Sequence, residues 1–398
     1  MSLFTKSIDE ITFEDVEQFI VNWKEGVRVE YKEDFPTSLP KSVSSFANTL
    51  GGVMVLGVKE DNQVQAHSII GLAKVTGIKE KVIDSSVNGI YPSVLPDVKV
   101  IDLPADPSKV VVVIKISESD LAPHAIQNST KIPIRQENIT QIIVDADIDR
   151  IEFLLKRRED SKKFREELFG KMLDHCQKDL KQAEDKKMPL IQIGISPLYP
   201  YKPIIAKDRL YKFANEYSSH RGLFFRIRSD AQRISDGVFN RLLEENSYVY
   251  NRLNDYGCLL SIQAISEYSR KDRDDTKTYL TLYSILNPLW HYLELVSQLY
   301  KTCDPPYRGN LLIEVNLINV LNREIILSEW TSIHQYPSHE KQISLFRQLI
   351  TDELKDIHLI VQSIGKEIFW AFQIDSPEMD KIIDKSLRDN GFLPPLKS

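Results

Sequence analysis

Glu25 and Glu30 lie five positions apart, and a third carboxylate, Glu60 or Asp61, follows a later apolar stretch. Carboxylate oxygens are hard ligands of the kind that Mg²⁺ or Mn²⁺ prefers. Such ions stabilise the attacking and the leaving oxygen during phosphodiester cleavage. A neighbouring cation, here Lys32, can neutralise the negative charge that develops in the transition state. The pattern therefore favours metal-dependent cleavage of nucleic acid as one hypothesis.

A strand, a helix and a second strand must position these acids. Residues 27–32 alternate between apolar and charged, which predicts a half-buried strand with Glu30 and Lys32 on one face. Residues 39–50 have the apolar spacing of a helix, and Gly51 is a typical helix end. The apolar run 53–58 predicts a strand covered on both faces, with the third acid leaving its end.

The same residues also have a simpler interpretation. Glu25 and Glu30 could be ordinary surface acids, with Glu30 and Lys32 forming a weak exposed ion pair. Asn48 and Thr49 lie in the last turn of the predicted helix, where they either cap it locally or orient Glu30. Spacing by itself does not choose between these possibilities.

This part of the chain resembles the Schlafen AlbA-like domain. The resemblance covers about residues 13–155, and its motifs occur in the expected order. They are Glu25, Val29-Glu30-Tyr31-Lys32, Ser45-Phe46-Ala47-Asn48-Thr49, Gly51-Gly52, Gly57-Val58, the apolar strand 110–116, Pro123-His124, a short strand ending in Arg135 and a closing helix over 147–155.

The resemblance implies an α+β fold with a mixed sheet in the N-terminal half. Some Schlafen proteins are similar in carrying a three-carboxylate endoribonuclease site that cuts tRNA or rRNA. That likeness implies catalytic roles for Glu25, Glu30, Lys32 and Glu60 or Asp61, with Glu25, Glu30 and Asp61 as ligands of Mg or Mn. This chain departs from the pattern at Lys59, which stands where an acid could be expected.

Several basic residues and one histidine are candidates for phosphate contact. His124 and Arg135 could instead make structural hydrogen bonds. The basic cluster at 156–158 could belong to a solvated connector helix. The full set of predicted nucleic-acid-binding residues is Lys59, His124, Arg135, Lys156, Arg157 and Arg158.

The charge of the chain is unevenly distributed. The net charge is −6, and residues 1–150 hold 15 Lys and Arg against 22 Asp and Glu. Residues 151–398 are nearly balanced, with 36 against 35. Because non-specific affinity for DNA comes from Lys and Arg on phosphates, the acidic half cannot be a simple electrostatic clamp. A nuclease could use the charge of its metal ions, whereas a binder needs a localised patch.

Other functional classes are disfavoured. Gly52 to Lys59 nearly mimics a phosphate-binding loop, but Lys does not directly follow Gly57 and the spacer is apolar, so we expect no ATP. No apolar run is long enough for a membrane helix, and the first residues do not look like a signal peptide. The three cysteines are widely spaced, which is typical of a cytoplasmic protein without disulfides.

The sequence predicts a Schlafen AlbA-like domain at 1–158, a charged helical connector at 159–188 and a mixed α/β domain at 189–398. In the last domain, strands are predicted at 190–195, 222–227, 257–265, 311–320 and 324–329. Helices are predicted at 206–218, 276–301, 339–361 and 378–389.

Nucleic-acid binding is the leading functional prediction, with RNA favoured over DNA. Its sharper form is a metal-dependent endoribonuclease acting on structured RNA such as tRNA. The alternative is a non-catalytic DNA- or RNA-binding regulator whose C-terminal domain senses a ligand or a partner, and a third possibility is a dimerisation scaffold. Schlafen nuclease cores pair two similar lobes, and only one is found here, so a homodimer is expected.

Overall fold

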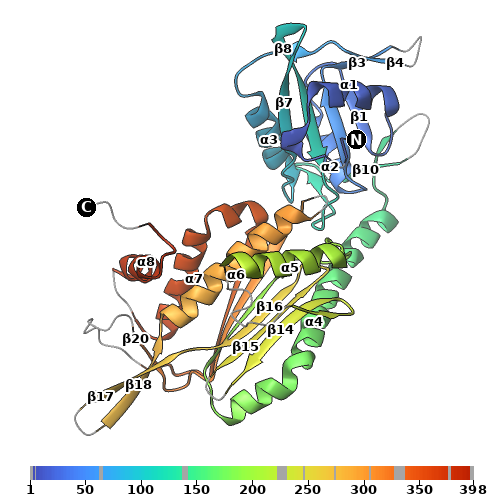
Figure 1. Ribbon diagram of the computed structural model, residues 1–398. Helices are drawn as coiled ribbons and strands as arrows, with labels where there is room; N and C mark the ends of the chain where they lie inside the picture. The colour runs from blue at the N-terminus through green and yellow to red at the C-terminus, as the bar shows by residue number, and fades with distance from the viewer. Residues whose placement is uncertain are drawn as a thin grey trace. The chain divides into compact units, whose positions relative to one another are not determined.

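The computed structural model describes residues 3, 4, 6–61, 66–136, 142–221, 231–244, 247–272, 275–303, 306–326, 337–374 and 378–394. The chain divides into two compact units, residues 1–161 and 162–398 (Figure 1). Each unit has its own hydrophobic core and is described by itself.

The N-terminal unit is built on a mixed sheet. Strand β1 is parallel to β2, and β8 runs antiparallel to β2, β5 and β7. The strands are β1 (Val29–Lys32), β2 (Gly52–Leu56), β5 (Leu72–Ala73), β7 (Asp97–Leu103) and β8 (Asp106–Ile116). Val110 to Ile114 are fully buried in β8, so the apolar strand expected at 110–116 lies at the centre of the sheet, and the α+β fold is confirmed.

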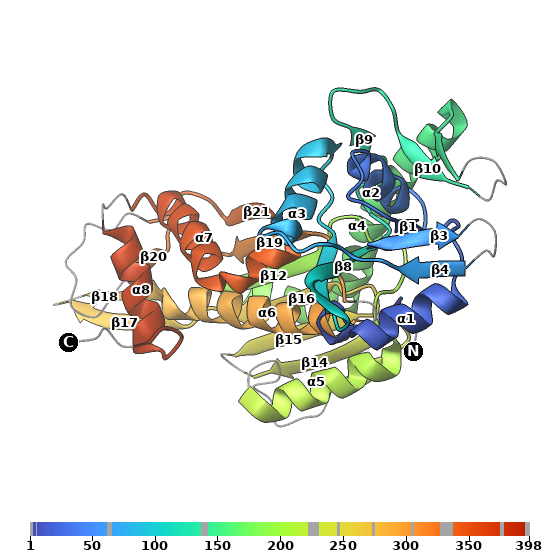
Figure 2. The same cartoon turned by 90° about the horizontal axis from the view of Figure 1, so that it is seen from above.

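Helices cover both faces of this sheet, as Figures 1 and 2 show. A 3₁₀ turn η1 (Ile8–Glu10) and α1 (Phe13–Asn22) pack on one face. The other face is covered by α2 (Leu39–Ala47) and α3 (Ile78–Gly89). Alternation along β1 therefore sends Val29 and Tyr31 toward α1 and turns Glu30 toward α2.

The strand predicted at 53–58 ends earlier than expected. Gly57 adopts φ +88, and a Cβ there would lie 3.0 Å from the Cα of Gly71. The chain turns at this glycine, and the next strand β3 (Val58–Asp61) pairs with β4 (Ala66–Ile69) in a separate ladder. Glu60 and Asp61 consequently belong to a different sheet from Glu30.

Two further short ladders complete the unit. Strand β6 (Ile90–Tyr91) pairs with β9 (Ala125–Ile126), and β10 (Pro133–Arg135) pairs with β11 (Ile143–Asp145). The β6–β9 ladder ties the segment after β8 back to an earlier part of the chain, whereas the β10–β11 ladder lies within that segment.

Helix α4 (Ile148–Asp185) is one continuous helix. The sequence predicted a closing helix and a separate charged connector, but no break separates them. The division between the two units falls within α4, at residues 161 and 162.

The C-terminal unit is built on a seven-stranded antiparallel sheet. Apolar residues of α4 pack on one face, and α5 to α8 cover the other. The strand order is β13 (Gln232–Ile234), β14 (Gly237–Leu243), β15 (Tyr248–Asn254), β16 (Leu259–Ala264), β12 (Leu190–Pro197), β19 (Asn310–Ile318) and β21 (Gln342–Ile350). A smaller sheet contains β17 (Glu267–Asp272), β18 (Asp275–Thr281) and β20 (Glu324–Ile326).

The helices of this unit differ in part from the prediction. The helix predicted at 276–301 begins only at residue 283, after β18, and much of the one predicted at 339–361 is strand β21. In β21, Ile343 is buried and Phe346 is 56% exposed, which is the alternation of a strand and not the period of a helix. The observed helices are α5 (Lys207–Arg221), α6 (Tyr283–Thr302), η2 (Thr351–Lys355), α7 (Ile357–Ala371) and α8 (Met379–Asp389).

The strands predicted at 190–195, 257–265 and 311–320 are confirmed, and the one predicted at 222–227 lies outside the described residues. All three cysteines are buried and free. Across the part of the chain that the structure describes, no helix combines the length and apolar character needed to cross a membrane.

Candidate functional site

Glu30 is buried under helix α2, with only 4% of its surface exposed. Its Oε2 accepts a hydrogen bond of 2.7 Å from Nη1 of Arg135, which lies 105 positions later in the chain. Its Oε1 accepts a bond of 2.8 Å from the hydroxyl of Ser42 and lies 3.1 Å from Nζ of Lys32. We call Glu30, Arg135, Ser42 and Lys32 the Glu30 cluster.

Arg135 completes the cluster from strand β10. Its Nη2 donates to the carbonyl oxygen of Gly26 at 2.8 Å, and its guanidinium lies 3.9 Å above the ring of Phe46. Its backbone N–H donates to the hydroxyl of Thr49 at 2.9 Å. The side chain is 1% exposed, so the predicted contact between Arg135 and phosphate is wrong for the folded domain.

Burial by itself would raise the pKa of Glu30. The positive charges of Lys32 and Arg135, together with hydrogen bonds from Arg135 and Ser42, outweigh it and hold that pKa below its usual value. Glu30 is therefore a carboxylate at neutral pH. A buried charge of this kind requires its partners, because an unpaired ion in the interior is costly.

Glu25 and Lys32 lie at the outer side of the cluster. Oε1 of Glu25 accepts a bond of 2.7 Å from the backbone N–H of Tyr31 and lies 3.9 Å from Nζ of Lys32. The side chains of Glu25 and Lys32 are 27% and 35% exposed. Lys32 thus bridges the two glutamates, and the structure brings Glu25, Glu30 and Lys32 together as predicted.

A divalent ion does not fit the Glu30 cluster. Oε1 of Glu30 already accepts a hydrogen bond from Ser42 and lies beside Nζ of Lys32, and Oε2 is paired with Arg135. A divalent ion bound to this carboxylate would therefore be repelled by two positively charged side chains. Among the side chains that the structure describes, no group of three His, Cys, Asp or Glu is arranged as metal ligands. The side chains of Glu60 and Asp61 lie outside that description. A metal site that includes them stays a prediction.

Asn48 connects helix α2 to the segment that follows β8. Its Nδ2 donates to the carbonyl oxygens of His124 and Pro133, both at 2.8 Å, and its Oδ1 accepts the backbone N–H of His124 at 2.7 Å. The hydroxyl of Thr49 donates a hydrogen bond to the carbonyl oxygen of Ser45 and accepts one from the backbone N–H of Arg135. The Ser-Phe-Ala-Asn-Thr stretch therefore has a structural function, which spacing alone could not decide.

His124 is also buried, with 0% of its surface exposed. Its Nδ1 lies 2.6 Å from the carbonyl oxygen of Pro92. Burial lowers the pKa of His124 to about 4, so the ring is neutral at pH 7. A buried neutral ring cannot attract phosphate, and the predicted phosphate contact of His124 is therefore wrong.

The remaining predicted contacts lie on α4 and β3. Nη1 of Arg157 pairs with Glu118 at 2.7 Å, and Arg158 donates to the carbonyl oxygen of Leu121. Both arginines are half-buried and hold the loop after β8, whereas Lys156 is exposed. Lys59 is 55% exposed and lies 3.6 Å from Glu33. Lys156 and Lys59 are therefore the two residues of this set with substantially exposed side chains.

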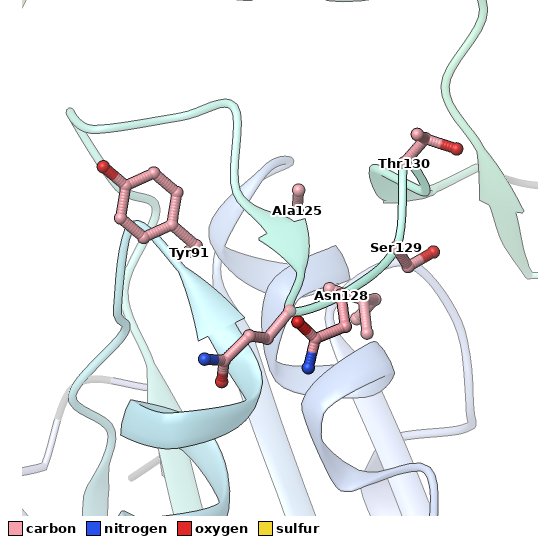
Figure 3. A pocket seen from close by; sticks show the side chains of 7 residues that line it. Tyr91, Ala125, Asn128, Ser129 and Thr130 are labelled. Atoms are coloured by element: carbon pink, nitrogen blue, oxygen red, sulfur yellow. The ribbon is translucent and has the colours of Figure 1, made fainter.

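A hollow lies beside strands β6 and β9, at residues that were not predicted as a site (Figure 3). Its volume is about 460 Å³. Tyr91, with 74% of its surface exposed, stands at one side. We call it the Tyr91 hollow, and its lining residues are Tyr91, Ala125, Ile126, Gln127, Asn128, Ser129 and Thr130. In the sequence, the apolar pair 125–126 is followed by four polar residues, 127–130, and this run is the pattern that could have indicated a polar site.

Residues 22–144 match the family model described as "Schlafen, AlbA_2". A similar solved structure is the N-terminal domain of a RecG-related protein from Nitrosomonas europaea, with 18% identity and a TM-score of 0.27. The match covers 34% of this chain and 92% of that one. No curated protein matches the chain.

Proposed function

Residues 22–144 are a Schlafen AlbA-like domain, and on that premise we propose that the chain is a nucleic-acid-binding protein in which the Glu30 cluster is structural. The family match supports nucleic-acid binding. The ion pair between Glu30 and Arg135 carries the second half of the proposal, because it occupies the carboxylate that a metal would need.

The finer parts of the proposal follow from the same resemblance. Similarity to Schlafen endoribonucleases favours RNA over DNA, and their paired lobes favour a homodimer. The three free cysteines support a cytoplasmic location. The C-terminal unit then serves as the sensor or partner-binding part of a regulator. The homodimer is tested by the molar mass of the full chain in solution, where a monomer would contradict it.

A single assay tests binding and cleavage together. The purified full chain is incubated with a labelled tRNA and with duplex DNA, with and without Mn²⁺, and each mixture is run on native and on denaturing gels. We expect a retarded band for the tRNA on the native gel, weaker retardation of the DNA, and intact tRNA on the denaturing gel.

Two variants make the assay decisive. Glu25→Gln removes a half-exposed carboxylate of the predicted catalytic set, and Glu33→Gln removes an exposed acid just after the same strand. Cleavage that requires Mn²⁺ and is lost in Glu25→Gln but not in Glu33→Gln would show that the predicted catalytic residues around Glu25 and Glu30 are active. If neither nucleic acid is retarded, the binding function itself is wrong.

A further inference from the structure

The Tyr91 hollow has the volume and the lining of a site for one small, partly polar group. Tyr91 pairs with Ala125 across the β6–β9 ladder, so the neighbour directly opposite its ring carries only a methyl group. Figure 3 shows Tyr91 on one side of Ala125 and Thr130 on the other. The volume of about 460 Å³ falls within the ~300–1,000 Å³ typical of ligand sites.

The polar side of the hollow is a closed turn. The N–H of Ile126 donates to the carbonyl oxygen of Lys131 at 3.0 Å, and the N–H of Ser129 donates to that of Ile126 at 3.0 Å. The hydroxyl of Ser129 accepts from the N–H of Lys131 at 3.1 Å. Asn128 adopts φ +59, the left-handed conformation that asparagine tolerates in turns. These bonds define the backbone that presents Gln127, Asn128 and Thr130.

Both ends of this turn are fixed to the interior. Asn48 binds the backbone of His124 before the turn and the carbonyl oxygen of Pro133 after it. The ring of His124 also binds the carbonyl oxygen of Pro92, next to Tyr91. A site held in this way is organised before its ligand arrives, which reduces the entropy lost on binding.

The chemistry of the hollow suits a nucleobase better than a phosphate. Its lining is an exposed aromatic ring together with neutral amide and hydroxyl groups. Residues 1–150 carry more acids than bases, so affinity here cannot depend on phosphate charge alone. Stacking on an aromatic ring is available to every base, and neutral polar groups can bind the edge of a stacked base.

Resting on the proposed nucleic-acid binding, we propose that the Tyr91 hollow accepts one unpaired base of single-stranded nucleic acid, stacked on Tyr91 and contacted at its edge by Asn128 and Thr130. Bases within a duplex already stack on each other and cannot enter such a hollow. Unpaired loops and ends are therefore the class of ligand that this domain recognises.

The test measures the affinity of the full chain for a fluorescein-labelled single-stranded RNA and for the same RNA as a duplex. A second copy of each probe carries 2-aminopurine, whose fluorescence falls when it stacks on an aromatic ring. We expect Tyr91→Ala to weaken single-strand binding by about 5- to 100-fold, the loss of one stacked base. Tyr91→Phe, which keeps the ring, should bind within about twofold of the wild type and retain the quenching.

Two further variants separate the possible results. Tyr268→Ala removes an exposed tyrosine from the C-terminal unit and should change nothing. Asn128→Gly keeps the left-handed backbone but removes the amide, and should weaken single-strand binding less than Tyr91→Ala does. If wild type and Tyr91→Ala bind the single strand equally, the base site is wrong while the proposed function stands. If the wild type binds neither probe, the proposed function itself is wrong.

Discussion

The Glu30 cluster and the Tyr91 hollow differ in both chemistry and exposure. The cluster contains charged residues of the types found at catalytic sites, yet the side chains of Glu30 and Arg135 are only 5% and 1% exposed. The hollow contains neutral residues around a ring that is 74% exposed. Residue type therefore predicts what a side chain could do, whereas its packing partners decide whether a ligand can reach it.

Asn48 and His124 connect the two regions. Asn48 extends from helix α2, which also supplies Ser42 to the Glu30 cluster, and it binds the backbone of His124 just before the hollow. Arg135 lies two residues after Pro133, whose carbonyl oxygen Asn48 also binds. The buried polar residues thus support the backbone that forms the exposed site. The following variants test how much the buried charged and polar groups stabilise the fold compared with exposed residues.

Glu30→Gln should have the largest effect. It leaves the Arg135 guanidinium buried without its carboxylate, which should lower the free energy of unfolding by about 3–5 kcal/mol. Glu33→Gln, at an exposed acid after the same strand, should change it by less than ~0.5 kcal/mol. Urea denaturation followed by circular dichroism measures both, and equal midpoints for the two variants would show that the ion pair does not stabilise the fold.

Acid should destabilise the fold through His124. Its pKa is about 4 when folded, below the ordinary 6.5, so as pH falls the unfolded chain takes up the proton first. The free energy of unfolding should fall by roughly 3 kcal/mol between pH 6.5 and pH 4.

The comparison for this effect is His124→Gln, which lacks the titrating ring. Urea midpoints measured across the same pH range should fall less steeply for the variant than for the wild type. Parallel slopes would assign the acid sensitivity to other groups. Folding also lowers the pKa of Glu30. Below pH ~4.3, protonation of Glu30 should therefore further reduce the free energy of unfolding of both proteins.

The smallest expected effect compares two lysines. Lys32 lies 3.1 Å from the buried Glu30, whereas Lys59 lies 3.6 Å from the exposed Glu33. Lys32→Gln should lower the free energy of unfolding by up to ~1 kcal/mol, and Lys59→Gln by less than ~0.5 kcal/mol. Thermal denaturation of the two variants measures the difference. A larger decrease in the free energy of unfolding for Lys59→Gln than for Lys32→Gln would contradict this prediction.

Much of the N-terminal fold could be predicted because local patterns specify it. The capping box of Thr12 and Asp15 begins α1, and the apolar run 110–116 forms the buried strand β8. The C-terminal unit is less predictable from local patterns, because the helix predicted at 339–361 is largely strand β21, whose burial alternates along the chain. The sequence of a short apolar segment does not show which strand it will pair with. Here β21 forms a strand because it pairs with β19 along its whole length.

Sequence patterns were sufficient to predict the fold class, the resemblance of about residues 13–155 to the Schlafen AlbA-like domain and the proximity of Glu25, Glu30 and Lys32. The family match then covers residues 22–144. The contact between Glu30 and Arg135 depends on tertiary packing, because it joins residues 105 positions apart. The same holds for the Tyr91 hollow, whose two sides come from β6 and from the turn after β9. Spacing places residues on one element, whereas burial and charge pairing depend on which distant elements pack together.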